Sequence, residues 1–155
     1  MQLYLLRHAN ADTIAETDDA RCLSEKGLAQ AKKVARFCAA QEIEPALILS
    51  SPVRRAHETA LIVSAHLRAE LAVEHWLSCG MNPEHATHEL RDHRALSTVM
   101  IVGHEPDFSR LVAHLLGLVS EERIAIRKAS LTLLEIDSFR AGGACLHYSL
   151  PCRMM

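Results

Sequence analysis

Residues 3–9 have the sequence Leu-Tyr-Leu-Leu-Arg-His-Ala. The apolar residues predict a buried strand over residues 2–6, and Arg7 and His8 follow directly at its carboxyl end. In an open α/β sheet, this end of a strand is where ligands bind. An arginine offers phosphate a planar, permanently charged fork, and a histidine ring nitrogen can act as a nucleophile. This pair is therefore the first candidate for a functional site.

Strand and helix patterns alternate along the rest of the chain. Short apolar runs predict further strands over residues 46–49, 71–76, 98–102, 130–136 and 144–149. Helical periodicity and start signals predict helices over residues 25–41, 52–68, 83–94 and 106–116.

Capping residues mark several of these helix ends. Ser24 is the expected N-cap of the helix over 25–41, whose apolar face would carry Leu28, Ala31, Ala35 and Cys38. Ser51 followed by Pro52 predicts an N-cap and a first helical position for the helix that runs to about residue 68.

The alternation predicts an α/β fold, a three-layer αβα sandwich in which helices cover both faces of a mostly parallel sheet. Residues 140–143 form too short a turn for a parallel crossover, so at least one strand should run antiparallel, at an edge of the sheet. A length of 155 residues predicts one domain over residues 1–155.

Composition excludes several classes of partner. The formal net charge is −2, so the overall charge favours neither nucleic acid nor acidic membranes as a partner. Five cysteines, with no CxxC spacing, predict reduced thiols in a cytoplasmic protein. The sequence shows no pattern of a signal peptide or a transmembrane helix.

Two further strand ends carry the same chemistry as Arg7 and His8. The strand over 46–49 is followed by Ser-Ser-Pro-Val-Arg-Arg, and the strand over 98–102 by Gly-His-Glu-Pro. Each alone is typical of a capped helix or a solvated loop. If the strands are parallel, however, the three ends meet at one edge of the sheet, where arginines and helix N-termini favour an anion. The sequence therefore predicts a phosphate site.

Four segments carry a resemblance to a known family: Leu-Arg-His-Ala at 6–9, Leu-Ser-Glu-Lys-Gly at 23–27, Ser-Pro-Val-Arg-Arg-Ala-His-Glu-Thr at 51–59 and Val-Gly-His-Glu-Pro at 102–106. Together they resemble the histidine phosphatase superfamily, also called the phosphoglycerate mutase-like superfamily. The short chain and the sequence Asp-Asp-Ala-Arg-Cys-Leu-Ser at 18–24 are most similar to the SixA-type phosphohistidine phosphatase branch. The resemblance implies a phosphoglycerate mutase-like fold.

The resemblance also implies roles for the residues at the strand ends. His8 would be the nucleophile, forming a transient phosphohistidine, and Arg7 and Arg55 would clamp the phosphoryl group. His104 would contact that group, either protonated or as a neutral donor. Nearby guanidinium charges should keep His8 unprotonated near neutral pH. Arg54 competes with Arg55 for its role, but adjacent helical residues do not share a face, and the Arg-Ala-x-x-Thr pattern favours Arg55.

Two more residues are candidates for binding the substrate. Arg21 corresponds to an arginine of small SixA-like proteins. The alternative is that Arg21 is only a solvated charge on the loop. His57, two residues after Arg55, would lie at the rim of the pocket. The resemblance implies neither a metal nor a cofactor, because the arginines supply the positive charge.

A general acid is hard to identify in the sequence. Glu84 is a weak candidate, and Asp12, Glu105 and Asp107 are no better. General acid catalysis is typically worth ~10²–10⁴-fold, so its absence disfavours alkyl phosphates more than a phosphoramidate, whose imidazole leaves easily. The short stretch between the strands over 71–76 and 98–102 also leaves little room for a covering lid, which favours a side chain presented by another protein.

These observations predict an enzyme, a phosphatase that removes the phosphoryl group from a phosphohistidine-bearing protein such as a phosphotransfer domain. Two alternatives stay open. One is a small-molecule phosphomonoesterase of the same superfamily, and the other is a phosphate-binding or interaction module without turnover.

Overall fold

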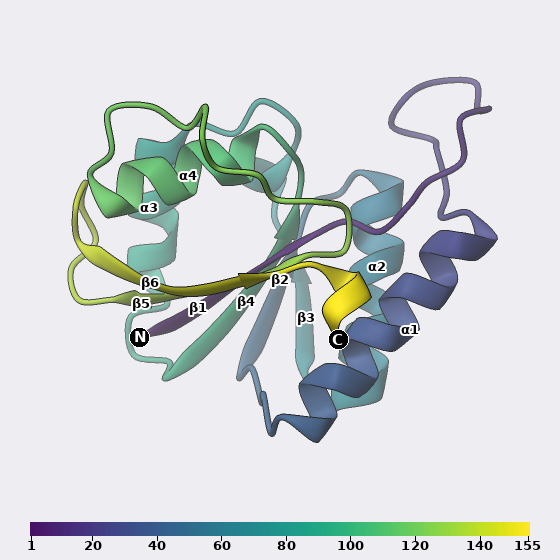
Figure 1. The fold of residues 1–155 in the computed structure, drawn as a ribbon, viewed down its shortest axis with the longest axis horizontal. Coiled ribbons are helices and arrows are strands. Elements are labelled where there is room, and N and C mark those ends of the chain that lie inside the picture. The colour runs from purple at the N-terminus through teal and green to yellow at the C-terminus, as the bar shows by residue number, and fades with distance from the viewer.

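The computed structural model describes residues 1–155 and contains a six-stranded sheet in the order β3-β2-β4-β1-β5-β6 (Figure 1). Strands β1, β2, β3 and β4 are parallel to one another, whereas β5 is antiparallel to both β1 and β6. The strands span Gln2–Arg7 (β1), Leu47–Ser50 (β2), Glu70–Val73 (β3), Thr98–Gly103 (β4), Leu131–Ile136 (β5) and Ala144–Leu150 (β6).

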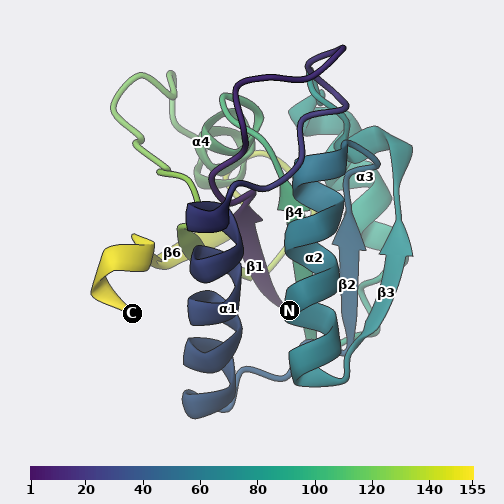
Figure 2. The same cartoon turned by 90° about the vertical axis from the view of Figure 1, so that its right-hand side faces the viewer.

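Helices cover both faces of the sheet. The helices span Glu25–Ala40 (α1), Arg54–Leu67 (α2), Pro83–Asp92 (α3) and Asp107–Leu116 (α4), and short 3₁₀ turns span His75–Leu77 (η1) and Cys152–Met154 (η2). Figure 2 shows α1 and α2 side by side in front of the strands, with α3 and α4 behind them. The predicted three-layer αβα sandwich with a mostly parallel sheet is confirmed.

The apolar run of β1 is buried on both faces of the sheet. Leu3 and Leu5 pack in the cluster under α3 and α4, while Tyr4 and Leu6 pack in the cluster under α1 and α2. The three leucines are fully buried, and each contributes about 1.5–3 kcal/mol relative to an exposed side chain. Hydrophobic burial therefore holds the strand that leads into His8.

Three details differ from the sequence-based expectations. Helix α2 begins at Arg54 with Val53 as its N-cap, so the prediction of Ser51 as N-cap is wrong. The Ser51 side chain forms a hydrogen bond with His104 instead. Leu28 was expected on the buried face of α1 but is half-exposed. Val34, which was not expected there, is buried on that face. The antiparallel strand β5 lies inside the sheet, since β6 pairs with its outer side.

The segment between β1 and α1 projects beyond the sheet (Figures 1 and 2), and its beginning at Asn10 closely approaches the first turn of α1 at Gly27. Ser24 caps α1 by accepting from the Gly27 N–H at 3.2 Å, and its own N–H donates to the Asn10 carbonyl at 3.1 Å. A Cβ at Gly27 would lie 1.9 Å from that carbonyl oxygen. Glycine is therefore required for α1 to close this segment. None of the helices combines the length and the apolar character that spanning a membrane requires.

We expect Gly27→Ala to destabilise the protein. Alanine is the better helix former by ~1 kcal/mol, but its methyl group meets the Asn10 carbonyl, and overpacking of this kind costs about 1–3 kcal/mol. The free energy of unfolding from urea denaturation measures the difference. Lys32→Ala, a change at an exposed position of the same helix, is the control. A Gly27→Ala protein as stable as the control would contradict the close approach.

Candidate active site

The carboxyl ends of β1, β2 and β4 lie at one edge of the sheet. Arg7 is in register with Gly103, and Ser50 with Val102, so the residues that follow these strands become neighbours. The rings of His8 and His104 are 5.2 Å apart between centroids and tilted by 51°. Arg55 lies in the first turn of α2, directly after the end of β2.

One ring nitrogen of His8 is tied to the backbone. His8 Nδ1 lies 2.8 Å from the Ala9 carbonyl oxygen. Because a carbonyl can only accept, Nδ1 carries the proton in this contact and Nε2 keeps its lone pair. The Ala9 N–H in turn donates to Thr59 Oγ1 at 3.1 Å, which fastens this turn to α2. The local geometry thus leaves Nε2 as a nucleophile of defined orientation.

His8 is also held neutral. Burial is the largest cause that lowers its pKa, to about 3, and the positive charges of Arg55 and Arg7 lower the pKa by smaller amounts. The sequence predicted the arginines as the main cause, whereas the 6% exposure of the side chain matters more. A neutral ring near pH 7 is the form that can attack phosphorus.

His104 is buried and bound to Ser51. Its Nε2 lies 2.8 Å from Ser51 Oγ, which also accepts from the Val53 N–H at 3.2 Å. The Ser51 hydroxyl keeps its hydrogen and a second lone pair, so it can donate to the Nδ1-protonated tautomer of His104 or accept from the Nε2-protonated one. His104 Nδ1 has no protein partner and is buried. Of the two predicted forms, the neutral ring fits, because burial lowers the pKa of His104 to about 4.

Arg55 is the arginine of its pair that faces inward. Its side chain is 7% exposed, whereas Arg54 is largely exposed and pairs with Glu58 at 2.8 Å. Glu58 also accepts from the Leu23 N–H at 2.7 Å, and Thr59 donates to the Arg55 carbonyl at 2.7 Å. The Arg-Arg-Ala-His-Glu-Thr motif thus holds two segments against α2: Glu58 binds the residue before the N-cap of α1, and Thr59 binds the turn after β1.

Asp18 binds the Arg55 guanidinium, a contact that the sequence did not suggest. Arg55 Nη2 lies 3.0 Å from Asp18 Oδ2, and Arg55 Nη1 donates to the Asp18 carbonyl at 2.7 Å. Asp18 also pairs with Arg21 at 2.8 Å, and Arg21 Nε donates to the Asp12 carbonyl. The hydrogen bond from Arg21 and the charge of Arg55 lower the pKa of Asp18. This carboxylate therefore occupies part of the arginine fork that an anion would use.

Arg7 retains donors for a ligand. Its Nη1 donates to the Ile126 carbonyl at 2.7 Å, and its Nε is buried without a protein partner. Since guanidinium carries five N–H groups in a fixed fork, the contact to Ile126 orients the fork and leaves other donors free.

The remaining predicted site residues are less closely connected. Arg21 reaches this edge through Asp18, as described. The His57 side chain forms no hydrogen bond in the structure, and its Nδ1 is buried without a partner, so its role at the rim stays a prediction.

The carboxylates considered as general acids have other contacts. Glu105 accepts from the backbone and hydroxyl of Ser109, and Asp107 accepts from the Gly80 N–H at 2.9 Å. Asp12 lies on the segment that Arg21 contacts, and Glu84 is exposed in the first turn of α3. No hydrogen bond or ion pair joins any of these four carboxylates to His8 or His104.

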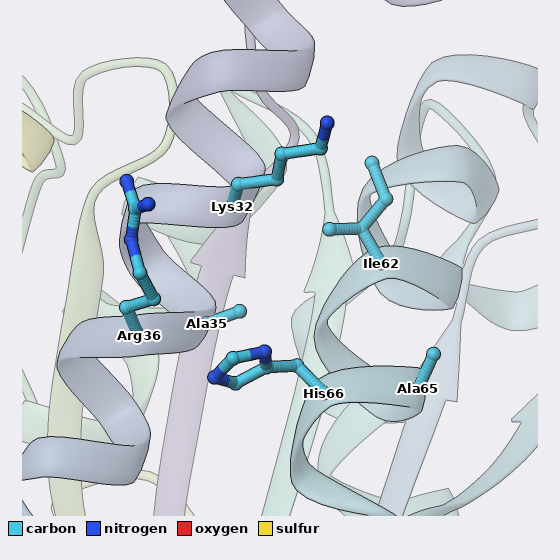
Figure 3. Close-up of a pocket in the computed structure, with 6 residues that line it drawn as sticks. All are labelled: Lys32, Ala35, Arg36, Ile62, Ala65 and His66. Carbon is cyan, nitrogen blue, oxygen red and sulfur yellow. The ribbon is translucent and has the colours of Figure 1, made fainter.

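A hollow lies between α1 and α2, away from the residues at the strand ends (Figure 3). It measures ≈ 500 Å³ and is lined by Lys32, Ala35, Arg36, Ile62, Ala65 and His66. It contains none of the residues at the strand ends, and three of its six residues are small or apolar.

Comparison with known proteins agrees with this site. Residues 3–78 match the model of the histidine phosphatase superfamily (branch 1), a segment that contains the Arg7-His8 turn and the Arg55 motif. The motifs and this match make the chain similar to the histidine phosphatase superfamily. No curated protein sequence matches the chain significantly.

Solved structures share the fold over nearly the whole chain. The protein histidine phosphatase SixA complexed with tungstate is 22% identical, with a TM-score of 0.88 over 99% of this chain and 98% of that chain. A candidate SixA phosphohistidine phosphatase from Agrobacterium tumefaciens is 24% identical, with a TM-score of 0.83 over 97% of both chains. The alpha-ribazole phosphatase from Shigella flexneri is 16% identical, with a TM-score of 0.82 over 98% and 97%.

We expect Ser51→Ala to lower turnover about tenfold, the equivalent of one hydrogen bond, because His104 loses the hydrogen-bond partner that orients its ring. Steady-state kinetics on a phosphoramidate measure the loss. Ser50→Ala is the matched control, since Ser50 is equally buried but donates to the Ser51 carbonyl at 2.9 Å. Equal turnover in the two variants would contradict a positioning role for Ser51.

The lowered pKa of His8 predicts a loss of stability in acid. Above pH 6.5 the ring is neutral in both states, whereas between pH 6.5 and about 3 only the unfolded chain binds the proton, so stability falls as pH falls. Between pH 7 and pH 5 this amounts to about 2 kcal/mol. Urea denaturation should therefore show a smaller acid loss in His8→Gln than in the wild type. Parallel losses in both proteins would refute the lowered pKa.

Proposed function

We propose that this protein is a phosphohistidine phosphatase that acts on a phosphorylated histidine of another protein, with His8 as the nucleophile. The observation that carries the proposal is His8 itself: a buried, neutral ring whose Nδ1 is engaged by the Ala9 carbonyl, beside two arginines and His104. Arg7, Arg55 and the Nδ1 of His104 supply donors for the phosphoryl oxygens.

The reaction needs two displacements at phosphorus. In the first, His8 Nε2 forms a bond to phosphorus while the P–N bond of the substrate breaks, and the substrate ring, protonated on its other nitrogen, leaves as neutral imidazole. In the second, water attacks phospho-His8, which releases inorganic phosphate and restores the neutral ring. Charge on the three phosphoryl oxygens is balanced throughout by the arginine forks.

The state of the carboxylates supports nitrogen-bound phosphate as the substrate. An alkoxide leaving group needs a proton donor, and the acid should then have a pKa near the working pH. Asp18 is the carboxylate in contact with Arg55, but its pKa is lowered, so it stays ionised and cannot donate a proton. Glu105 and Asp107 are engaged by Ser109 and Gly80. An imidazole leaves without such help.

A small-molecule phosphomonoesterase is the second candidate function. It is favoured by the shared fold of the Shigella flexneri alpha-ribazole phosphatase, which covers 98% of this chain. The two candidates differ in the leaving group, oxygen or nitrogen, and in the size of the molecule that carries it.

A substrate panel separates the two functions. We expect kcat/KM for a phosphohistidine-bearing phosphotransfer domain to exceed that for alkyl phosphate esters by at least ~10²-fold, the lower value of general acid catalysis. Comparable values on both classes would favour the phosphomonoesterase. Intact mass after brief incubation should show a phosphoryl adduct that is lost in His8→Ala and retained in His66→Ala, a change in the hollow of Figure 3. If no adduct and no phosphate release occur with any donor, the protein is a binding module.

A further inference from the structure

A hollow of ≈ 520 Å³ adjoins Arg7 and is lined almost wholly by polar residues. Four cations from three separate segments face it: Lys26 at the start of α1, Arg127 and Lys128 before β5, and Arg153 in η2. Arg7 belongs both to this hollow and to the candidate active site, so the two are continuous. We call it the basic hollow.

Protein carboxylates do not neutralise the basic hollow. Arg110, Arg54, Arg55 and Arg21 form the arginine ion pairs of the structure, and the four cations of the hollow form none. The pKa of Lys128 is lowered, first by burial and then by the positive charges of Arg7, Arg21 and Arg55. In a chain of net charge −2, this is a local excess of positive charge that a bound anion would relieve.

The walls of the basic hollow are fastened to one another. The Cys152 thiol approaches the Gln30 carbonyl at 3.9 Å, and Lys33 Nζ donates to the Arg153 carbonyl at 3.4 Å, which joins η2 to α1. Both ribbon views place η2 beside α1 (Figures 1 and 2). On the other side, the contact from Arg7 to the Ile126 carbonyl holds the segment that carries Arg127 and Lys128. The positive groups are therefore assembled before a ligand arrives.

We propose that the basic hollow binds the carboxylates of an acidic segment next to the phosphohistidine of the protein substrate. This inference rests on the proposed function and adds the kind of partner surface that the site selects. Lys26, Arg127 and Arg153 are exposed at the ends of long side chains, an arrangement that fits several spread carboxylates better than one compact anion. Such rim charges steer association and select among partners.

A binding experiment tests the surface independently of turnover. The probe is an unphosphorylated peptide with histidine flanked by glutamates, and its match has glutamines at the same positions. We expect Lys26→Gln/Arg127→Gln to weaken binding of the glutamate peptide about 3- to 10-fold at low salt, as for the loss of two rim charge pairs. The control is Lys32→Gln/Arg36→Gln, which removes the same charge from the hollow in Figure 3.

Each outcome of the binding experiment supports or overturns the inference. Binding that weakens only in Lys26→Gln/Arg127→Gln, and only for the glutamate peptide, supports it. Equal weakening in both double variants means unspecific attraction, and no weakening in either means that the hollow is not used; both overturn it. Preferential binding of a small bisphosphate over the glutamate peptide would assign the hollow to a second phosphate instead.

Turnover of the phosphorylated peptides separates this inference from the proposed function. We expect kcat/KM to be higher for the glutamate peptide, and the advantage to disappear in Lys26→Gln/Arg127→Gln and above about 0.3 M salt, where exposed charges are screened. Equal, measurable turnover of both peptides refutes the acidic docking alone. Absence of turnover on either peptide refutes the proposed function, and the binding experiment then decides the docking.

Discussion

The parallel register of β1, β2 and β4 is the constraint on which the candidate site depends. Because Arg7 lies opposite Gly103 and Ser50 opposite Val102, the three strands end at the same level. The next residues along each strand are then brought together, although they are far apart in the chain. The closeness of the His8 and His104 rings and the bond between His104 and Ser51 both follow from this alignment.

In the candidate site, the positive charge and the nucleophile belong to different residues. Its charge comes from arginines, which stay protonated, while burial keeps both histidines neutral. Asp18 then supplies the counter-charge that Arg55 would otherwise lack. An incoming phosphoryl group would compete with this carboxylate for the same fork. The projecting segment between β1 and α1 is therefore part of the site's electrostatics, and its attachment at Gly27 and Glu58 bears on the chemistry.

Much of the fold could be predicted because apolar runs and helix signals act over a few residues. All six strands and all four helices occur close to their predicted positions. Errors arose where a local signal competes with a distant partner. Ser51-Pro52 has the local pattern of a helix start, yet the Ser51 hydroxyl bonds His104, 53 residues away, and the helix begins later. Leu28 fits the helical period, but its side chain is half-exposed, and Val34 is buried on that helix instead.

The sequence by itself determined the order of strands and helices, the resemblance to the histidine phosphatase superfamily, and the four residues Arg7, His8, Arg55 and His104 that the fold gathers at one edge. These follow from short motifs that can be recognised from a few adjacent residues. Only the tertiary structure decided which histidine nitrogen is free, why the rings are neutral, and that Asp18 occupies the Arg55 fork. The physical reason is that proton positions and pKa values depend on burial and on hydrogen-bond partners brought from distant parts of the chain.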